Sequence, residues 1–179
     1  MPSRRPALDV ISHSPDQTRQ IGYRLGRLAR PGDIYLLSGQ VGGGKTTFVQ
    51  GLARGLGVRG SVQSPTFALA MEHAGQAASG EPAILFHLDF YRLEGAEDLE
   101  TFGYEEYLQA PEGIVAVEWP ERLSLALPEA YLLVSFDHLA EAKRRLRFQP
   151  YGSRPQELVS GLREEVTGAP RRSAPAGDR

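Results

Sequence analysis

The chain has 179 residues, a formal net charge of −2, 41% hydrophobic and 23% charged residues, values that suggest one globular domain with a sizeable core. It contains no cysteine, which excludes disulfides, thiolate chemistry and cysteine-bound metals. The near-neutral charge gives no overall attraction to nucleic acid or anionic lipid, and no apolar run is long enough to span a membrane, so we expect a cytoplasmic protein.

The first predicted elements are a strand over residues 7–12, a helix, and a second strand over residues 34–38. Ser14 is expected to cap the helix, with Pro15 at its first position and Gln17 completing a capping box. Apolar residues then recur at helical spacing on one face of this segment.

A glycine-rich loop follows the second strand and leads into another helical pattern. It fits the phosphate-binding pattern G-x-x-x-x-G-K-[ST]. The glycines let backbone N–H groups approach phosphate oxygens, and the new helix adds the positive end of its dipole. Lys45 supplies a charge for the outer phosphates, and the Thr46 hydroxyl is placed for Mg²⁺. The predicted binding loop is Gly39, Gln40, Val41, Gly42, Gly43, Gly44, Lys45, Thr46 and Thr47.

Further along the chain, short β-like runs outnumber helical ones. Two strands, over 66–72 and 83–90, are separated by a loop rich in small residues and are expected to form an antiparallel hairpin. Two short helical turns, a strongly β-like run and a further pair of strands are then predicted, over residues 96–101, 104–109, 113–119, 131–136 and 145–149.

A last amphipathic helix is predicted near the C-terminus. Ser153 and Gln156 have the spacing of a capping box at its start. We expect one domain over residues 1–166, and a disordered tail over residues 167–179 because that segment is rich in Pro, Ala, Gly and Arg. The pattern predicts an α/β, P-loop NTPase-like fold with a mixed sheet of roughly seven strands, few flanking helices and partly bare faces.

Two acidic residues end predicted strands. Asp89 follows the apolar run at 84–88, and Glu118 follows the run at 114–117. Ligands in open α/β sheets lie beyond the carboxyl ends of strands, so both acids are candidates to hold Mg²⁺ or to orient a water molecule. An acid after an apolar strand is also common for reasons of solvation alone.

Other candidate site residues could have either a functional or a purely structural role. Thr66, in the segment Ser-Pro-Thr-Phe, could reach Mg²⁺ or the γ-phosphate, or its segment could simply begin a strand. His87 could position Asp89 or a water molecule or be structural, and Arg92 could contact phosphate, a partner acid or solvent. Trp119 could stack on a base or lie in the core. The basic run Lys143, Arg144, Arg145 and Arg147 could contact RNA or form a solvated strand edge.

Four segments together resemble the TsaE (YjeE) family, the bacterial ATPase required for threonylcarbamoyladenosine synthesis in tRNA. They read GQVGGGKTTFVQGLARGLG, SPTF, HLDFYRL and VEWPERL, in that order, within roughly residues 33–135. The phosphate loop alone is generic, whereas the combination is specific. The resemblance implies an accessory ATPase that binds ATP and Mg²⁺, acts with TsaB and TsaD, and meets tRNA only through that complex.

The resemblance also implies roles for individual residues. Lys45, Thr46 and Thr47 would hold phosphates and Mg²⁺, and Thr66 would belong to a switch-like segment. Asp89 and Glu118 would be the acids of the active centre, with Glu118 in the Walker-B-like position and Trp119 beside it.

One departure from the family concerns the phosphate loop, which usually reads GDLGAGKT. Here Gln40 replaces the aspartate, which could alter Mg²⁺ handling or hydrolysis while binding survives. A nucleotide-bound scaffold with little turnover therefore stays open. A small-molecule kinase also stays open, because a phosphate loop can transfer phosphate as well as hydrolyse it, although the sequence shows no arginine-rich lid between the motifs. A GTP-dependent switch is disfavoured, because the chain has no asparagine for an N-K-x-D motif.

Overall fold

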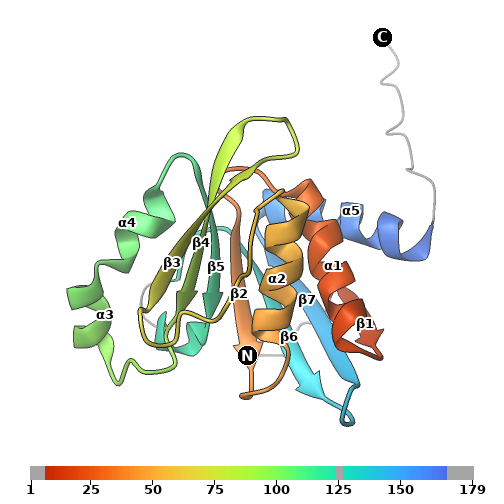
Figure 1. Cartoon of the computed structure of the whole chain (residues 1–179), viewed down its shortest axis with the longest axis horizontal. Coiled ribbons are helices and arrows are strands. Elements are labelled where there is room, and N and C mark those ends of the chain that lie inside the picture. Colours follow the sequence, from red (N-terminus) through yellow and green to blue (C-terminus); the bar gives the residue numbers. More distant parts are fainter. Residues whose placement is uncertain (1–6, 124–126, 169–179) are drawn as a thin grey trace.

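The computed structural model describes residues 7–123 and 127–168. Its centre is a mixed seven-stranded sheet in the order β1-β7-β6-β2-β5-β4-β3 (Figure 1). The pairs β2–β5, β2–β6 and β4–β5 are parallel, and the outer pairs are antiparallel. The expected mixed sheet is therefore confirmed. The strands are β1 (Leu8–Ser12), β2 (Ile34–Gly39), β3 (Ala70–Gln76), β4 (Pro82–Asp89), β5 (Gly113–Glu118), β6 (Tyr131–His138) and β7 (Arg144–Tyr151).

Helices pack on both faces of the sheet, but unequally. The larger hydrophobic core lies under the three longer helices, and a smaller one lies under the two short helices at the other face (Figure 1). No helix in the described parts of the chain is long and apolar enough to cross a membrane. The helices are α1 (Pro15–Leu28), α2 (Lys45–Gly55), α3 (Ala96–Phe102), α4 (Tyr104–Gln109), a 3₁₀ turn (Pro120–Leu123) and α5 (Ser153–Thr167).

The two-residue period of the strands decides which side chains reach each core. In β2, Tyr35 and Leu37 face the larger core while Leu36 faces the smaller one. On β6 and β7, the face turned away from the larger core is partly polar, with Arg147 paired to Asp137 at 2.9 Å. Among the described residues, no helix covers this half of the sheet on that side (Figure 1).

Helices α1 and α2 cross at very short range through glycines. An added Cβ at Gly22 would lie 2.2 Å from the Phe48 carbonyl oxygen, and one at Gly51 would lie 2.0 Å from the Arg19 carbonyl oxygen. Gly26 and Gly55 are equally tight. Backbones can approach this closely only where side chains are missing, so these glycines set the position of α2 against α1.

A buried ion pair ties α5 to the start of β2. The Arg154 guanidinium donates to both carboxylate oxygens of Asp33, at 2.9 and 2.8 Å, and also to the Leu28 carbonyl oxygen at 2.8 Å. The Asp33 side chain is only 2% exposed. Burial raises the pKa of the neighbouring Tyr35 hydroxyl well above its ordinary value, and the Asp33 charge adds to that shift. The C-terminal helix is thus anchored to the central strand.

Several element boundaries differ from expectation, most by one or two residues, whereas Ser14 caps α1 as predicted. Strand β3 begins at Ala70 rather than at residue 66, because residues 66–69 form a turn held to Asp89. The predicted Ser153 cap is wrong, since Ser153 is already helical and Gly152 precedes it with φ 99°. Thr167 ends α5, and the rest of the predicted tail, apart from Gly168, lies outside the described residues.

We predict that Gly51→Ala destabilises the fold although alanine favours helix. The new Cβ would lie against backbone, which cannot yield locally, so the free energy of unfolding should fall by about 3 kcal/mol. Gly161→Ala is the matched control, because its Cβ would meet only the end of the Leu28 side chain. That variant should stay within about 1 kcal/mol of the wild type in urea unfolding. Equal stability of both variants would contradict the packing constraint.

Candidate functional site

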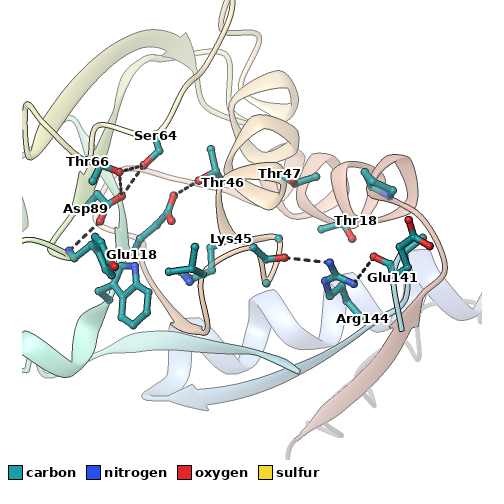
Figure 2. A pocket seen from close by; sticks show the side chains of 18 residues that line it. Thr18, Lys45, Thr46, Thr47, Ser64, Thr66, Asp89, Glu118, Glu141 and Arg144 are labelled. Carbon is teal, nitrogen blue, oxygen red and sulfur yellow. Dashed lines mark hydrogen bonds between the residues drawn. The ribbon is translucent and has the colours of Figure 1, made fainter. Parts of the chain in front are cut away.

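A cavity of about 500 Å³ opens at the carboxyl ends of β2, β4 and β5, beside the start of α2 (Figure 2). It brings together most of the residues predicted from the sequence. Gly39 and Gln40 line a smaller adjoining hollow that shares Trp119. The predicted residues that line the main cavity are Val41, Gly42, Gly43, Gly44, Lys45, Thr46, Thr47, Thr66, Asp89, Glu118 and Trp119.

The glycine-rich loop has the backbone geometry of an anion cradle. Gly42 and Gly44 have φ of 72° and 100°, a region that favours glycine. The Gly43 N–H donates to the Gln40 carbonyl oxygen at 3.0 Å and closes the turn. Helix α2 begins after Gly44 without a side-chain cap, so the N–H groups of its first turn face the cavity uncapped. This arrangement suits phosphate oxygens.

Lys45 lies buried at the base of the loop. Its ammonium donates to the carbonyl oxygens of Gly39 and Gln40, at 2.6 and 2.9 Å. It also lies 4.4 Å from the centre of the Trp119 ring. Burial lowers the pKa of Lys45, and the charges of Glu118 and Asp89 partly oppose that shift. A polyphosphate would add negative charge beside this ammonium and so favour its charged form.

Glu118 connects the helix to the sheet. One of its carboxylate oxygens accepts a hydrogen bond from the Thr46 hydroxyl at 2.8 Å (Figure 2). The same oxygen lies 2.8 Å from Nε2 of His87. Both Glu118 and His87 are buried. Their strands are parallel neighbours and both side chains point to the α2 face. His87 therefore contacts Glu118, whereas its spacing in the sequence suggests Asp89 or a water molecule as its partner.

Asp89 is held by the segment that follows α2. Its Oδ2 atom accepts hydrogen bonds from the hydroxyls of Ser64 and Thr66, at 2.6 and 2.9 Å (Figure 2). Its Oδ1 atom accepts one from the Tyr91 N–H at 3.0 Å. The hydroxyls of Ser64 and Thr66 also lie 2.8 Å apart. The Ser-Pro-Thr-Phe segment thus binds the Asp89 carboxylate and does not begin a strand.

The side-chain oxygens of the cavity could bind Mg²⁺ only together with phosphate oxygens. Within residues 7–123 and 127–168, no group of three or more His, Asp or Glu side chains is arranged to hold a metal ion. Thr46 and Glu118 are in contact, and Asp89 lines the same cavity. One hydroxyl and one or two carboxylates, completed by phosphate oxygens and water, are the usual protein share of a Mg²⁺ site.

Some residues of the cavity were missed by sequence reasoning. Pro15 and Thr18 come from α1, and Glu141, Ala142 and Arg144 from the β6–β7 turn. Arg144 donates to the Gly42 carbonyl oxygen at 3.1 Å (Figure 2). The run of basic residues was its only signal, and that run suggested RNA contact or a strand edge. Two of its other arginines pair with acids, Arg145 with Asp9 and Arg147 with Asp137.

Comparisons with known proteins agree on one family. The family model "Threonylcarbamoyl adenosine biosynthesis protein TsaE" matches residues 12–146. The Bacillus subtilis (strain 168) tRNA threonylcarbamoyladenosine biosynthesis protein TsaE is 33% identical over 149 residues, 83% of this chain and 89% of that protein. The Treponema pallidum protein of the same name is 36% identical over 136 residues, 76% of this chain and 96% of that protein. The crystal structure of Bacillus subtilis YdiB matches with a TM-score of 0.74 and 28% identity, covering 89% and 95% of the two chains.

We predict that the emission of Trp119, the only tryptophan, changes when ATP is added with Mg²⁺, because phosphates would draw the Lys45 ammonium from the indole ring. Lys45→Ala should raise the apparent dissociation constant of ATP at least about tenfold, because a charge-assisted contact to phosphate is lost. Lys143→Ala, the other lysine, is the control, since Lys143 does not line the cavity. Equal ATP affinity in the two variants would exclude the assigned role of Lys45.

Proposed function

Because the chain belongs to the TsaE family of threonylcarbamoyl adenosine biosynthesis proteins, we propose that it is a Mg²⁺-dependent ATPase with an accessory role in modifying tRNA. It would act as a subunit of a complex with TsaB and TsaD and would hydrolyse ATP to regulate or reset that complex. Contact with tRNA would be indirect, through the complex. The family assigns the chain to threonylcarbamoyladenosine synthesis, and the ATPase activity, cofactor and partners are our proposal.

The contact between Thr46 and Glu118 carries the proposal. A hydroxyl at the start of α2 and a carboxylate at the end of β5 meet at 2.8 Å, next to Lys45 and the glycine loop. This is the pairing of phosphate-loop threonine and strand-end acid that phosphate-loop NTPases use to hold Mg²⁺. It supports nucleotide turnover more strongly than a glycine loop alone, which only binds.

The proposed reaction is in-line attack of water on the γ-phosphate of ATP. The loop N–H groups and Lys45 would hold the phosphates and stabilise charge on the leaving oxygens. Thr46 and Glu118 would hold Mg²⁺, which would supply positive charge to offset the charge of the phosphates. Either Asp89 or Glu118 would orient the attacking water.

Two alternatives to the ATPase function have unequal support. A nucleotide-bound scaffold with little turnover is favoured by the three hydrogen bonds that already occupy Asp89. A small-molecule kinase would need a second substrate site and a segment that excludes water. Arg144 is the one arginine among the described residues that line the cavity, and it is engaged with loop carbonyls, so the kinase has less support.

We predict that Glu118→Gln keeps ATP affinity within about threefold but lowers kcat at least about 100-fold, because the amide cannot replace the charge of the carboxylate. Asp89→Asn should likewise lower kcat while keeping most of the ATP affinity. Glu112→Gln, at the opposite end of β5 and exposed, should keep the wild-type rate. Single-turnover phosphate release checks the rate and nucleotide titration checks the affinity. Full turnover in both site variants would remove these acids from the mechanism.

The overall proposal is tested by phosphate release from ATP and from GTP, by the protein alone and with purified TsaB and TsaD. We expect slow, ATP-selective release that changes when both partners are present. Release that is indifferent to the partners would favour the kinase, and nucleotide binding without release in either setting would favour the scaffold.

A further inference from the structure

The segment Ser64–Leu69, here called the latch, closes over Asp89 and is held by few contacts. Three hydrogen bonds from Ser64, Thr66 and the Tyr91 N–H use three of the roughly four acceptor positions of the Asp89 carboxylate. While they persist, Asp89 has little capacity left for Mg²⁺ or water. Movement of the latch would free the two acceptor positions on Oδ2 that the hydroxyls of Ser64 and Thr66 occupy.

The latch has an unusual backbone conformation at its end. Leu69 has φ 66°, a left-handed value that is uncommon for a residue other than glycine. Its N–H donates to the Pro65 carbonyl oxygen at 2.7 Å, which closes the turn. Its side chain packs against the smaller core. The latch is thus a strained turn anchored at one end on the smaller core.

Phe67 lies in the middle of the latch and points into solvent. Its side chain is 83% exposed, the largest value among the exposed large hydrophobic residues of the described chain. The Arg92 guanidinium lies 3.9 Å from the centre of its ring and supports one side of it. Tyr91, next to Arg92, is also exposed and contacts Trp119. A large apolar side chain exposed to this degree is typical of an anchor for a binding partner.

The charge beside this anchor indicates the chemistry of the partner. Residues 94–100, which closely follow Arg92, contain no lysine or arginine. Their four acidic side chains, Glu94, Glu97, Asp98 and Glu100, are all exposed. A phosphate backbone would be repelled here, so stacking of Phe67 on RNA bases is disfavoured. A protein surface with an apolar pocket and a basic rim is complementary.

We propose that Phe67, supported by Arg92, is a docking anchor for a protein partner that presents an apolar pocket with a basic rim. Binding of Phe67 in that pocket draws Ser64 and Thr66 away from Asp89, because these hydroxyls lie within three residues of the anchor along the chain. The partner then controls whether Asp89 is available. This inference rests on the proposed ATPase function and on the proposed TsaB–TsaD complex as the partner.

The test measures the affinity of the full chain for the purified TsaB–TsaD complex and phosphate release with and without it. We expect Phe67→Ser to lower the affinity at least about tenfold and to lose the change in rate that the complex causes. Its ATP affinity and its rate alone should stay within about twofold of the wild type, because Phe67 does not line the cavity. Arg92→Gln should lower the affinity less, and added salt should weaken the wild-type complex.

Ile11→Ser is the matched control, because Ile11 is 40% exposed and lies on β1, at the opposite edge of the sheet from β3. Wild-type affinity in Phe67→Ser, or an equal loss in Ile11→Ser, would overturn the docking anchor while leaving the ATPase proposal intact. Loss of tRNA binding in place of TsaB–TsaD binding would overturn the choice of a protein partner. A wild-type protein that hydrolyses ATP but neither binds nor responds to the complex would overturn both the anchor and the accessory role.

Discussion

The close crossing of α1 and α2 is the constraint on which the candidate site depends. At four glycines the two helices meet backbone to backbone, with no side chain between them. Helix α2 carries Lys45 and Thr46 in its first turn, and α1 brings Thr18 to the rim of the cavity. A shift of α2 by the width of one methyl group would move the loop N–H groups and Thr46 relative to Glu118, whose strand is fixed in the sheet.

Strand alternation supplies the second half of the site. His87, Asp89 and Glu118 end two parallel strands and all point to the α2 side, while Leu88 and Val117 fill the smaller core behind them. Each charged group of the site is already engaged by the chain itself: Lys45 by loop carbonyls, Glu118 by Thr46 and His87, and Asp89 by the latch. Ligand binding therefore exchanges internal contacts for contacts to phosphate, and this exchange limits the net gain in affinity.

Sequence patterns predicted those parts of the molecule that local chemistry determines. The glycine loop, the acids at the ends of β4 and β5, and the mixed sheet follow from spacing and periodicity over short segments. The turn before β3 was not predictable, because its cause is a pair of hydroxyls bound to Asp89, a residue distant in the chain. Arg144 reaches the loop for the same kind of reason: only the β6–β7 pairing brings it beside Gly42.

The pairing of β1 has a consequence for synthesis of the chain. Its only partner strand among the described residues is β7, so Leu8 cannot pair until Phe148 has been synthesised. At about 5–20 residues per second, that delay is on the order of ten seconds on the ribosome. Helices α1 and α2 are complete long before, and their glycine contact is local in the chain. The helix pair is therefore complete before β1 can join the sheet, which must follow the synthesis of β7.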